Sequence, residues 1–254
     1  MDALGISGGE VVWEIGPGLG SLTVDLARKR IRLIAFEIDH GFVRLLEDAF
    51  REESGITIVE GDFMKTWPGI HESSGTPDII VGNLPYSSAS AIFVSLIEGG
   101  LKARRIVCTV QKEAAARMTA RPGAPEYSSF SVLCALSWRI ERLGDLQPGS
   151  FYPSPRVRST ILSMEPQERS PAVSTQMLLP GVRALFAGRR KTLKNNLKSA
   201  LSDNKALLRE LSAEAEQNGF DLSRRPETLE PQMVEGLVAI LGKYIDWSKI
   251  RLPA

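Results

Sequence analysis

Short apolar runs alternate with helical patterns through the first half of the chain. The almost continuously apolar runs are residues 11–16, 31–39, 56–62, 78–83 and 104–111. Apolar positions at helical spacing occur at residues 20–30, 41–52, 88–98 and 112–120. Strands that are apolar on both faces are typical of a parallel sheet covered by helices on each side. The pattern therefore predicts an α/β fold built on an open, Rossmann-like sheet.

The end of this sheet is expected to be antiparallel. Residues 129–138 have a helical pattern, and residues 138–147 and 157–164 read as a final antiparallel pair of strands. The polar segment 165–173 follows and contains two prolines, which predicts a linker.

Beyond the linker the pattern is helical only. The apolar residues that recur at helical spacing are Leu185, Phe186, Leu193, Leu197 and Leu201. A last amphipathic helix is expected at residues 231–244. We therefore expect two domains, an α/β domain at residues 1–165 and a small all-helical domain at residues 174–254.

Composition narrows the class of protein. The 254 residues are 43% apolar and 24% charged, a mixture typical of globular proteins. Cys108 and Cys134 lie in apolar runs without the spacing of metal ligands, so we expect buried thiols, no disulfide and no metal site. The absence of a long apolar stretch and of a signal-peptide pattern favours a cytoplasmic protein without a membrane partner.

Charge is unevenly distributed although the net charge is only +1. Residues 1–166 carry 17 basic and 20 acidic side chains, whereas residues 167–254 carry 14 basic and 10 acidic ones. Within residues 183–209 there are eight basic residues and one acid, Asp203. This local excess predicts a basic face on the helical domain that binds phosphate groups.

A glycine-rich segment, Glu14-Ile15-Gly16-Pro17-Gly18-Leu19-Gly20, follows the first strand and opens a helix. Glycines permit a sharp turn and let a ligand approach the backbone closely, and the helix N-terminus adds a positive dipole. A dinucleotide-binding turn has the spacing G-x-G-x-x-G, but Ser21 stands where its last glycine would be. The motif therefore predicts a ligand site that does not bind a pyrophosphate.

Acidic residues stand at the ends of the next two strands. The second strand ends in Glu37-Ile38-Asp39, and the third ends in Gly61-Asp62. A carboxylate at the first position can accept hydrogen bonds from ribose hydroxyls, and one at the second can accept from an adenine amino group. Because the carboxyl ends of strands in an open α/β sheet meet at one edge, these positions predict a nucleoside site.

The end of the fourth strand carries Asn83-Leu84-Pro85-Tyr86. The exocyclic amine of adenine is a poor nucleophile, because its lone pair is delocalised into the ring. The Asn83 side-chain oxygen and a carbonyl beside Pro85 can accept hydrogen bonds from that amine, which orients the lone pair and stabilises developing charge. Pro85 stiffens the turn, and Tyr86 offers a ring on which a base can stack.

These motifs resemble one family. In this order, EIGPGLGSLT, AFEID, EGDF and GNLPYSSAS are similar to the ribosomal RNA adenine N6,N6-dimethyltransferases, a family that includes the kasugamycin-sensitivity methylase. Downstream segments agree: VQKEAAARM, YSSFSVL, FYPSPRVRST and RRKTLKNNL. The resemblance covers roughly residues 8–245 and implies a class I methyltransferase sheet with a C-terminal helical domain.

The resemblance also implies roles for particular residues. S-adenosylmethionine as cofactor would be bound by Gly16, Gly18, Glu37, Ile38, Asp62, Phe63 and Asn83. The catalytic set would be Asn83, Leu84, Pro85, Tyr86 and Phe151, with Phe151 stacking on the target adenine opposite Tyr86. The adenine has to be flipped out, because its amine cannot be reached in stacked RNA.

The implied partner is the RNA of the small ribosomal subunit in a pre-30S particle, bound by a monomer. The sequence places Arg189-Arg190-Lys191 and Lys194-Asn195-Asn196 on a helix of the second domain, where Arg189, Arg190, Lys191 and Lys194 are expected to contact RNA phosphates. The target would be two adjacent adenines near the 3′ end.

One segment departs from the family pattern. The family has an N-terminal Gly-Gln-Asn-Phe-Leu-like motif that helps to close over the methionine part of the cofactor, and none of the 13 residues before Glu14 matches it. We therefore expect weaker cofactor binding than in relatives that carry the motif.

Two other functions are compatible with these motifs. One is a macrolide-resistance methylase acting on large-subunit RNA, although RRKTLKNNL and the form of the NLPY motif favour the small-subunit branch. The other is a non-catalytic RNA-binding or assembly factor on the same fold, against which the intact Asn83–Tyr86 motif argues.

Overall fold

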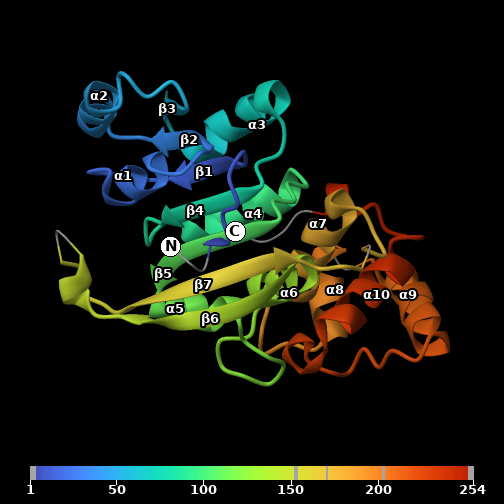
Figure 1. The fold of residues 1–254 in the computed structure, drawn as a ribbon. Helices are drawn as coiled ribbons and strands as arrows, with labels where there is room; N and C mark the ends of the chain where they lie inside the picture. Colours follow the sequence, from blue (N-terminus) through green and yellow to red (C-terminus); the bar gives the residue numbers. More distant parts are fainter. Residues whose placement is uncertain (1–3, 152–153, 170, 202–203, 251–254) are drawn as a thin grey trace. The chain divides into compact units, whose positions relative to one another are not determined.

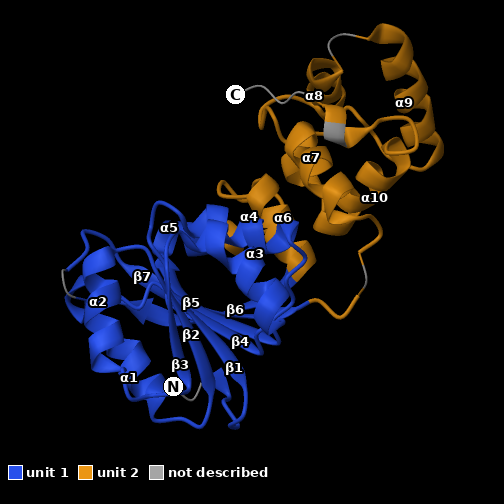
Figure 2. Ribbon diagram, turned by 90° about the horizontal axis from the view of Figure 1, so that it is seen from above, with its two compact units in different colours: residues 1–115, 138–166 blue, residues 116–137, 167–254 orange. Residues whose placement is uncertain are grey.

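The computed structural model describes residues 4–151, 154–169, 171–201 and 204–250. The chain forms two compact units, shown in Figure 2. Unit 1 comprises Met1–Ala115 and Trp138–Pro166, and unit 2 comprises Ala116–Ser137 and Gln167–Ala254. The sequence placed the boundary between domains at residue 165, so the structure differs in grouping residues 116–137 with the C-terminal helices.

Unit 1 is built on one sheet, whose strands lie in the order β3-β2-β1-β4-β5-β7-β6 (Figure 1). The strands are β1 (Val11–Ile15), β2 (Arg32–Glu37), β3 (Ile56–Glu60), β4 (Ile79–Asn83), β5 (Arg105–Gln111), β6 (Trp138–Leu146) and β7 (Ser159–Pro166). Neighbours from β3 to β5 pair in parallel, and β7 pairs antiparallel with both β5 and β6. The expected α/β sheet and its antiparallel end are thus confirmed.

Helices cover both faces of the parallel strands. They are α1 (Ser21–Ala27), α2 (His40–Ala49), α3 (Phe63–Ser74) and α4 (Ala89–Glu98), and α5 (Lys112–Met118) begins where β5 ends. Helices α1 and α2 lie on one side of the sheet, and α3 and α4 lie on the other (Figure 2). The change of side follows from the strand order, because the chain runs outward from β1 to β3 and then crosses back to β4.

Helix α3 was not expected from the sequence. Pro68 and Gly69 interrupt its apolar pattern, yet the Asp62 side chain caps the helix by accepting a hydrogen bond from the Met64 amide at 3.0 Å. Buried Trp67 donates from its indole to the Ser95 hydroxyl at 2.9 Å and lies over Gly99, where any Cβ would stand 2.2 Å from the ring. Tertiary packing against α4 therefore overrides a weak local pattern.

The core beneath the sheet's carboxyl edge contains three aromatic rings. Phe36 lies edge-on to Trp13 at a centroid distance of 5.1 Å and to Phe63 at 5.0 Å. All three side chains are buried. Edge-to-face contacts of this kind add to the free energy of apolar burial and fix the ring orientations. These contacts hold β1, β2 and the start of α3 together.

Unit 2 is helical. It contains α6 (Ser129–Ser137), α7 (Thr175–Leu185), α8 (Leu193–Ala200), α9 (Lys205–Gln217) and α10 (Pro231–Leu241). Short 3₁₀ turns occur in it at Pro226–Thr228 and Trp247–Lys249, and another lies in unit 1 at Pro148–Ser150. Residues 116–137 join this unit because Tyr127 is fully buried in it. Its ring packs edge-on to Phe186 at 5.9 Å, and its hydroxyl donates to the Leu229 carbonyl at 2.8 Å.

The expected linker is attached to helix α10. Strand β7 extends to Pro166, and the segment that follows bonds to Glu235, whose side chain is only 2% exposed. The Ala172 amide donates to the Glu235 carboxylate at 2.8 Å, and Arg169 forms an ion pair with the same group. The polar groups of this segment therefore supply the hydrogen bond and the ion pair that the buried Glu235 carboxylate requires.

Three findings, on the cysteines, on membrane-spanning helices and on metal sites, concern the described residues only. Cys108 and Cys134 are both buried, as the sequence indicated, and they form no disulfide with each other. Within the described part of the chain, no helix has the length and apolarity that crossing a membrane requires. Those residues also contain no group of three or more side chains suited to holding a metal ion.

The buried Tyr127 hydroxyl gives a test of unit 2. Tyr127→Phe leaves the Leu229 carbonyl without its donor in a buried setting, so we expect a loss of about 1–3 kcal/mol in the free energy of unfolding. The matched control is Tyr244→Phe, whose hydroxyl donates to Glu214 at an exposed site. That variant is expected to lose less than about 0.5 kcal/mol. Chemical denaturation of both variants decides the point, and equal losses would contradict the assignment.

Candidate functional site

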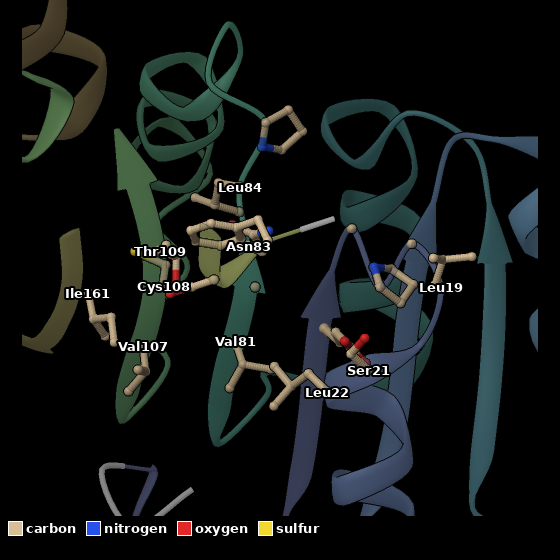
Figure 3. Close-up of a pocket in the computed structure, with 18 of the residues that line it drawn as sticks. Leu19, Ser21, Leu22, Val81, Asn83, Leu84, Val107, Cys108, Thr109 and Ile161 are labelled. Carbon is tan, nitrogen blue, oxygen red and sulfur yellow. The ribbon is translucent and has the colours of Figure 1, made fainter. Parts of the chain in front are cut away.

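A cavity of about 1030 Å³ opens at the carboxyl ends of β1 and β4. Its walls include Glu14, Gly16, Gly18, Asn83, Tyr86 and Phe151. Figure 3 shows Asn83 and Leu84 at the end of β4, with Cys108 and Thr109 of β5 on one side and the turn carrying Leu19 and Ser21 on the other. The cavity lies where strand order reverses between β1 and β4, the position at which open α/β sheets bind ligands.

The glycine-rich turn approaches the end of β4 closely. Gly16 has φ of +69°, and a Cβ added there would stand 3.6 Å from the Asn83 carbonyl oxygen. Gly18 has φ of +56°, and no atom lies within 4 Å of the position its Cβ would take. Left-handed backbone at both positions requires glycine, and the space beside Gly18 leaves its backbone open to a ligand.

Glu37 holds this turn in place. One of its carboxylate oxygens accepts from the Gly18 amide at 2.9 Å, and the other accepts from the amides of Ile38 at 2.8 Å and Asp39 at 2.9 Å. The side chain is 6% exposed. A carboxylate has about four acceptor sites, so one site remains for a ligand hydroxyl after these three bonds. Glu37 thus organises the turn in addition to its predicted contact with a ribose.

The predicted adenine-binding residues differ in what they expose. Ile38 is an exposed apolar side chain, 68% accessible, immediately after β2. Asp62 is half-buried at the start of α3, where one carboxylate oxygen caps the helix. The Phe63 ring is buried in the aromatic cluster with Phe36 and therefore cannot stack on a ligand, so only the Phe63 backbone is placed to make contact.

In the Asn83–Tyr86 turn, some backbone groups form hydrogen bonds within the protein, and one remains available to a ligand. The Leu84 amide donates to the Thr109 carbonyl at 3.0 Å, and the Pro85 carbonyl accepts from Ser88 and Ala89 amides at 3.1 and 3.0 Å. No described residue donates to the Leu84 carbonyl, which is therefore the acceptor beside Pro85 that remains available. The Leu84 side chain itself is buried and serves packing.

Asn83 faces the cavity with an uncommitted side chain. It is exposed, and no described residue forms a hydrogen bond with its amide group. An amide oxygen without an internal partner can accept from a ligand amine at no cost in lost protein hydrogen bonds. The structure thus brings the glycine-rich turn and Asn83 to one cavity, as the sequence predicted. The predicted residues Glu37, Ile38, Asp62 and Phe63 are not among those that line it.

Two aromatic residues border the same cavity. Tyr86 is half-buried and Phe151 is half-buried, and they come from the β4–α4 turn and the loop between β6 and β7. Tyr152 and Pro153 of the same loop motif lie outside the described residues. Aromatic side chains at two edges of one cavity provide surfaces on which a planar base can stack.

Glu14 is a further candidate that the predicted site residues did not include. Its carboxylate lines the cavity although the side chain is only 2% exposed, and it accepts a hydrogen bond from the Thr23 hydroxyl at 2.8 Å. Burial raises the pKa of Glu14 to about 7, the Thr23 hydrogen bond acts against this rise, and the Glu37 carboxylate adds to it. Such a group binds a cation strongly once it is ionised.

The basic residues of unit 2 lie partly on a turn. Arg189, Arg190 and Lys191 precede α8, whereas Lys194 lies on it, and all four are exposed. The prediction that the first three lie on a helix is therefore wrong. The helix begins only at Leu193, because the Thr192 hydroxyl caps it by accepting from the Asn195 amide.

The buried side chain of Asn196 holds the backbone of this turn through hydrogen bonds. It is 1% exposed, donates to the carbonyls of Leu185 at 2.7 Å and Gly188 at 3.1 Å, and accepts from the Gly188 amide at 3.0 Å. Asn196, which the sequence places beside the basic residues, therefore has a structural role in the turn. Because this buried amide makes three hydrogen bonds to the backbone, it holds the turn in one shape. The backbone that carries the basic side chains is therefore fixed.

Comparison with known proteins identifies the family. A sequence model of the ribosomal RNA adenine dimethylases matches residues 1–218. The chain belongs to this family. A relative from Treponema denticola, named ribosomal RNA small subunit methyltransferase A, is 42% identical over 199 residues, which are 77% of this chain and 68% of the relative. A protein of the same name from Borreliella afzelii is 37% identical over 210 residues, 83% of this chain and 73% of the relative.

Solved structures support the fold of this chain. A dimethyladenosine transferase from Plasmodium falciparum aligns with a TM-score of 0.78 and 23% identity, covering 99% of this chain and 95% of that one. The 23S rRNA methyltransferase ErmE aligns with a TM-score of 0.63 and 22% identity, covering 95% of this chain and 94% of that one. At these identities the likeness shows the fold alone.

The raised pKa of Glu14 predicts that the stability of this chain depends on pH. Because its folded pKa of about 7 lies above the ordinary 4.5, the folded chain binds the proton more tightly than the unfolded chain. Its contribution is fully present below about pH 4.5 and is lost as pH rises to about 7. Over that range the free energy of unfolding of the parent chain should fall by about 2–3 kcal/mol because of Glu14. Glu14→Gln should not show this fall.

Urea unfolding between pH 4.5 and pH 8, without ligand, measures this effect. Exposed Glu52→Gln is the matched control and should follow the parent chain. A parent chain and Glu14→Gln variant whose free energies of unfolding change in parallel with pH would contradict the raised pKa.

Proposed function

We propose that this chain transfers methyl groups from S-adenosylmethionine to N6 of adenine in small-subunit ribosomal RNA, twice on each of two adjacent adenines near the 3′ end. The observation that carries the proposal is the meeting of the uncommitted Asn83 amide with the glycine-rich turn on one cavity. Membership of the adenine dimethylase family and the names of the curated relatives supply the substrate class.

The cavity would hold part of the cofactor, and residues outside its lining would hold the rest. Its volume of about 1030 Å³ exceeds what a nucleoside-sized ligand fills, and the open space beside Gly18 is a cradle that any Cβ would occupy. Outside the lining of the cavity, Glu37 and Asp62 would hold the ribose and the adenine, and exposed Ile38 would cover the base. Buried Glu14, which lines the cavity, would face a positive charge. When bound, S-adenosylmethionine supplies an electrophilic methyl group on a sulfonium.

The protein's own part in the reaction is to prepare the amine. The Asn83 side-chain oxygen and the Leu84 carbonyl would each accept a hydrogen bond from the target N6. Two acceptors on the amine hydrogens turn the nitrogen lone pair out of conjugation and stabilise the positive charge that develops. Pro85 helps to fix the direction of the Leu84 carbonyl, because a proline restricts the backbone of the residue before it to extended conformations. The proton is released to solvent after transfer.

Tyr86 and Phe151 would hold the flipped base between them. Both border the cavity that Asn83 also lines, so a base stacked on either ring would lie in the same cavity as that amide. Stacking also compensates for the contacts that the adenine loses when it leaves the RNA stack. Positioning of this kind accounts for much of the rate in reactions where the cofactor carries the reactive group.

The basic turn formed by Arg189, Arg190 and Lys191, with Lys194 beside it, would bind RNA phosphates. Phosphate contacts fix the register of a structured RNA without reading its bases. We propose that the substrate is a pre-30S particle, that the protein acts on it as a monomer, and that it does so in the cytoplasm, where ribosomal subunits are assembled.

Asn83→Ala tests the chemistry. Loss of the side-chain acceptor leaves the amine lone pair conjugated, so we expect dimethyladenosine formation to fall by at least about 100-fold. Under-methylated small subunits are incubated with S-adenosylmethionine, and the RNA is digested and analysed by mass spectrometry. Asn218→Ala, at an exposed helix end, is the matched control and should retain full activity.

The same assay separates the alternatives. Transfer to large-subunit RNA in place of small-subunit RNA would identify a large-subunit methylase. RNA binding without transfer by the parent chain would identify a non-catalytic factor, and an Asn83→Ala variant with full activity would refute the role of Asn83.

Replacing Arg189, Arg190 and Lys191 together by Ala tests the RNA contact. We expect weaker binding to small-subunit RNA and a dependence of log affinity on log salt that is shallower by about 2–3, while cofactor affinity stays the same. Arg28-Lys29-Arg30 provides a matched control, since it is an exposed basic triplet in unit 1. If both triple variants bind RNA equally, the basic turn is not a contact surface.

A further inference from the structure

The Tyr86 ring has one hydrogen-bonding anchor among the described residues. Its hydroxyl lies 2.8 Å from the hydroxyl of Ser159, a residue 73 positions later in the chain. Both residues belong to unit 1, with Tyr86 on the turn after β4 and Ser159 as the first residue of β7. The contact therefore links the turn that presents Asn83 to the strand that follows the Phe151 loop.

Ser159 is an unexpected residue for its position. Its side chain is fully buried, with an exposed fraction of 0%. Burying a hydroxyl costs about 1–3 kcal/mol unless a hydrogen bond compensates for it, and an apolar residue would fill the space without that cost. The Tyr86 hydroxyl forms the hydrogen bond that compensates for this burial. A serine at this position is therefore explained by the tyrosine beside it.

The position of Ser159 is itself rigidly fixed. Ser159 pairs with Gln111 of β5 on one side and with Leu146 of β6 on the other. The next residue, Thr160, is also fully buried and donates to Asp145 at 2.7 Å, and Asp145 in turn accepts from Lys112 at 2.8 Å. The hydrogen bonds from Lys112 and Thr160 lower the pKa of the Asp145 carboxyl to about 2.

A tether at the phenol oxygen determines where the ring lies. This oxygen stands on the axis through Cβ and the ring, so fixing it fixes the direction of that axis and leaves only rotation about it. The main chain of the turn is already held by the bonds to the Pro85 carbonyl. With both ends fixed, the centre of the ring cannot move toward or away from the cavity.

We propose that Ser159 is a positioning residue for the methyl transfer: its buried hydroxyl holds Tyr86 so that a stacked adenine presents its amine to Asn83. This inference rests on the proposed function. A ring that swings freely still stacks on a base, but the base then samples many orientations, and only a fraction of them place the amine correctly. Ser159 therefore acts on turnover more than on binding.

Steady-state kinetics on under-methylated small subunits test the inference. Ser159→Ala should lower kcat about ten-fold, because one positioning hydrogen bond is lost, and should leave KM for S-adenosylmethionine unchanged. Tyr86→Phe, which keeps the ring and removes the oxygen, should give the same loss. The double variant should be no slower than either single one, since all three remove the same bond.

Two more variants separate positioning from packing. Ser159→Thr keeps the hydroxyl and should recover most of kcat. Ser163→Ala, the same change four residues further along β7, is the matched control and should behave as the parent chain. A Ser159→Ala or Tyr86→Phe variant with the parent's kcat would overturn the proposal, and so would losses that multiply in the double variant.

Tyrosine ring NMR gives a readout that does not depend on activity. The chain has only four tyrosines, so Tyr86→Phe assigns the Tyr86 ring signal by its disappearance. We expect that signal to report an ordered ring in the parent chain and in Ser163→Ala, and a mobile ring in Ser159→Ala. A ring equally ordered in all of them overturns the tether. Absence of methyl transfer by the parent chain, with the tether intact, counts against the proposed function alone.

Discussion

The Glu37 carboxylate is the interaction on which the site depends. Three backbone amides, from Gly18, Ile38 and Asp39, converge on its two oxygens, and two of them lie where β2 ends while the third lies in the turn after β1. A buried carboxylate is stable only with such partners. It therefore fixes the glycine-rich turn against the neighbouring strand, and the turn in that position comes close to the carbonyl of Asn83.

The second part of the site follows a division of labour within one turn. After β4, the amide of Leu84 and the carbonyl of Pro85 are used to hold the backbone, while the Asn83 side chain and the Leu84 carbonyl stay uncommitted. Acceptors that are held still but unused need no reorganisation when a substrate arrives, which is the physical basis of electrostatic preorganisation. Rigidity and reactivity therefore come from different atoms of the same four residues.

Much of this was visible in the sequence, and what was missed has physical causes. Buried parallel strands are continuous apolar runs, and the carboxyl ends of such strands share an edge, so the meeting of the glycine-rich turn with Asn83 followed directly. Helix α3 was missed because Pro68 and Gly69 break its pattern while Trp67 packs against α4. Contacts that span the fold, such as Tyr86 with Ser159, have no signature in local sequence.

The two compact units are interleaved along the chain, because residues 116–137 leave the first unit and β6 and β7 return to it. A nascent chain therefore completes the glycine-rich turn and β1 to β5 while Phe151 and Ser159 are still unsynthesised. The residues that would bind the cofactor are therefore synthesised early, and Phe151 and Ser159, which would help to position the base, are synthesised late. A fragment that stops before β7 would lack the central antiparallel strand of its sheet, and the whole of unit 1 exists only once residue 166 has been made.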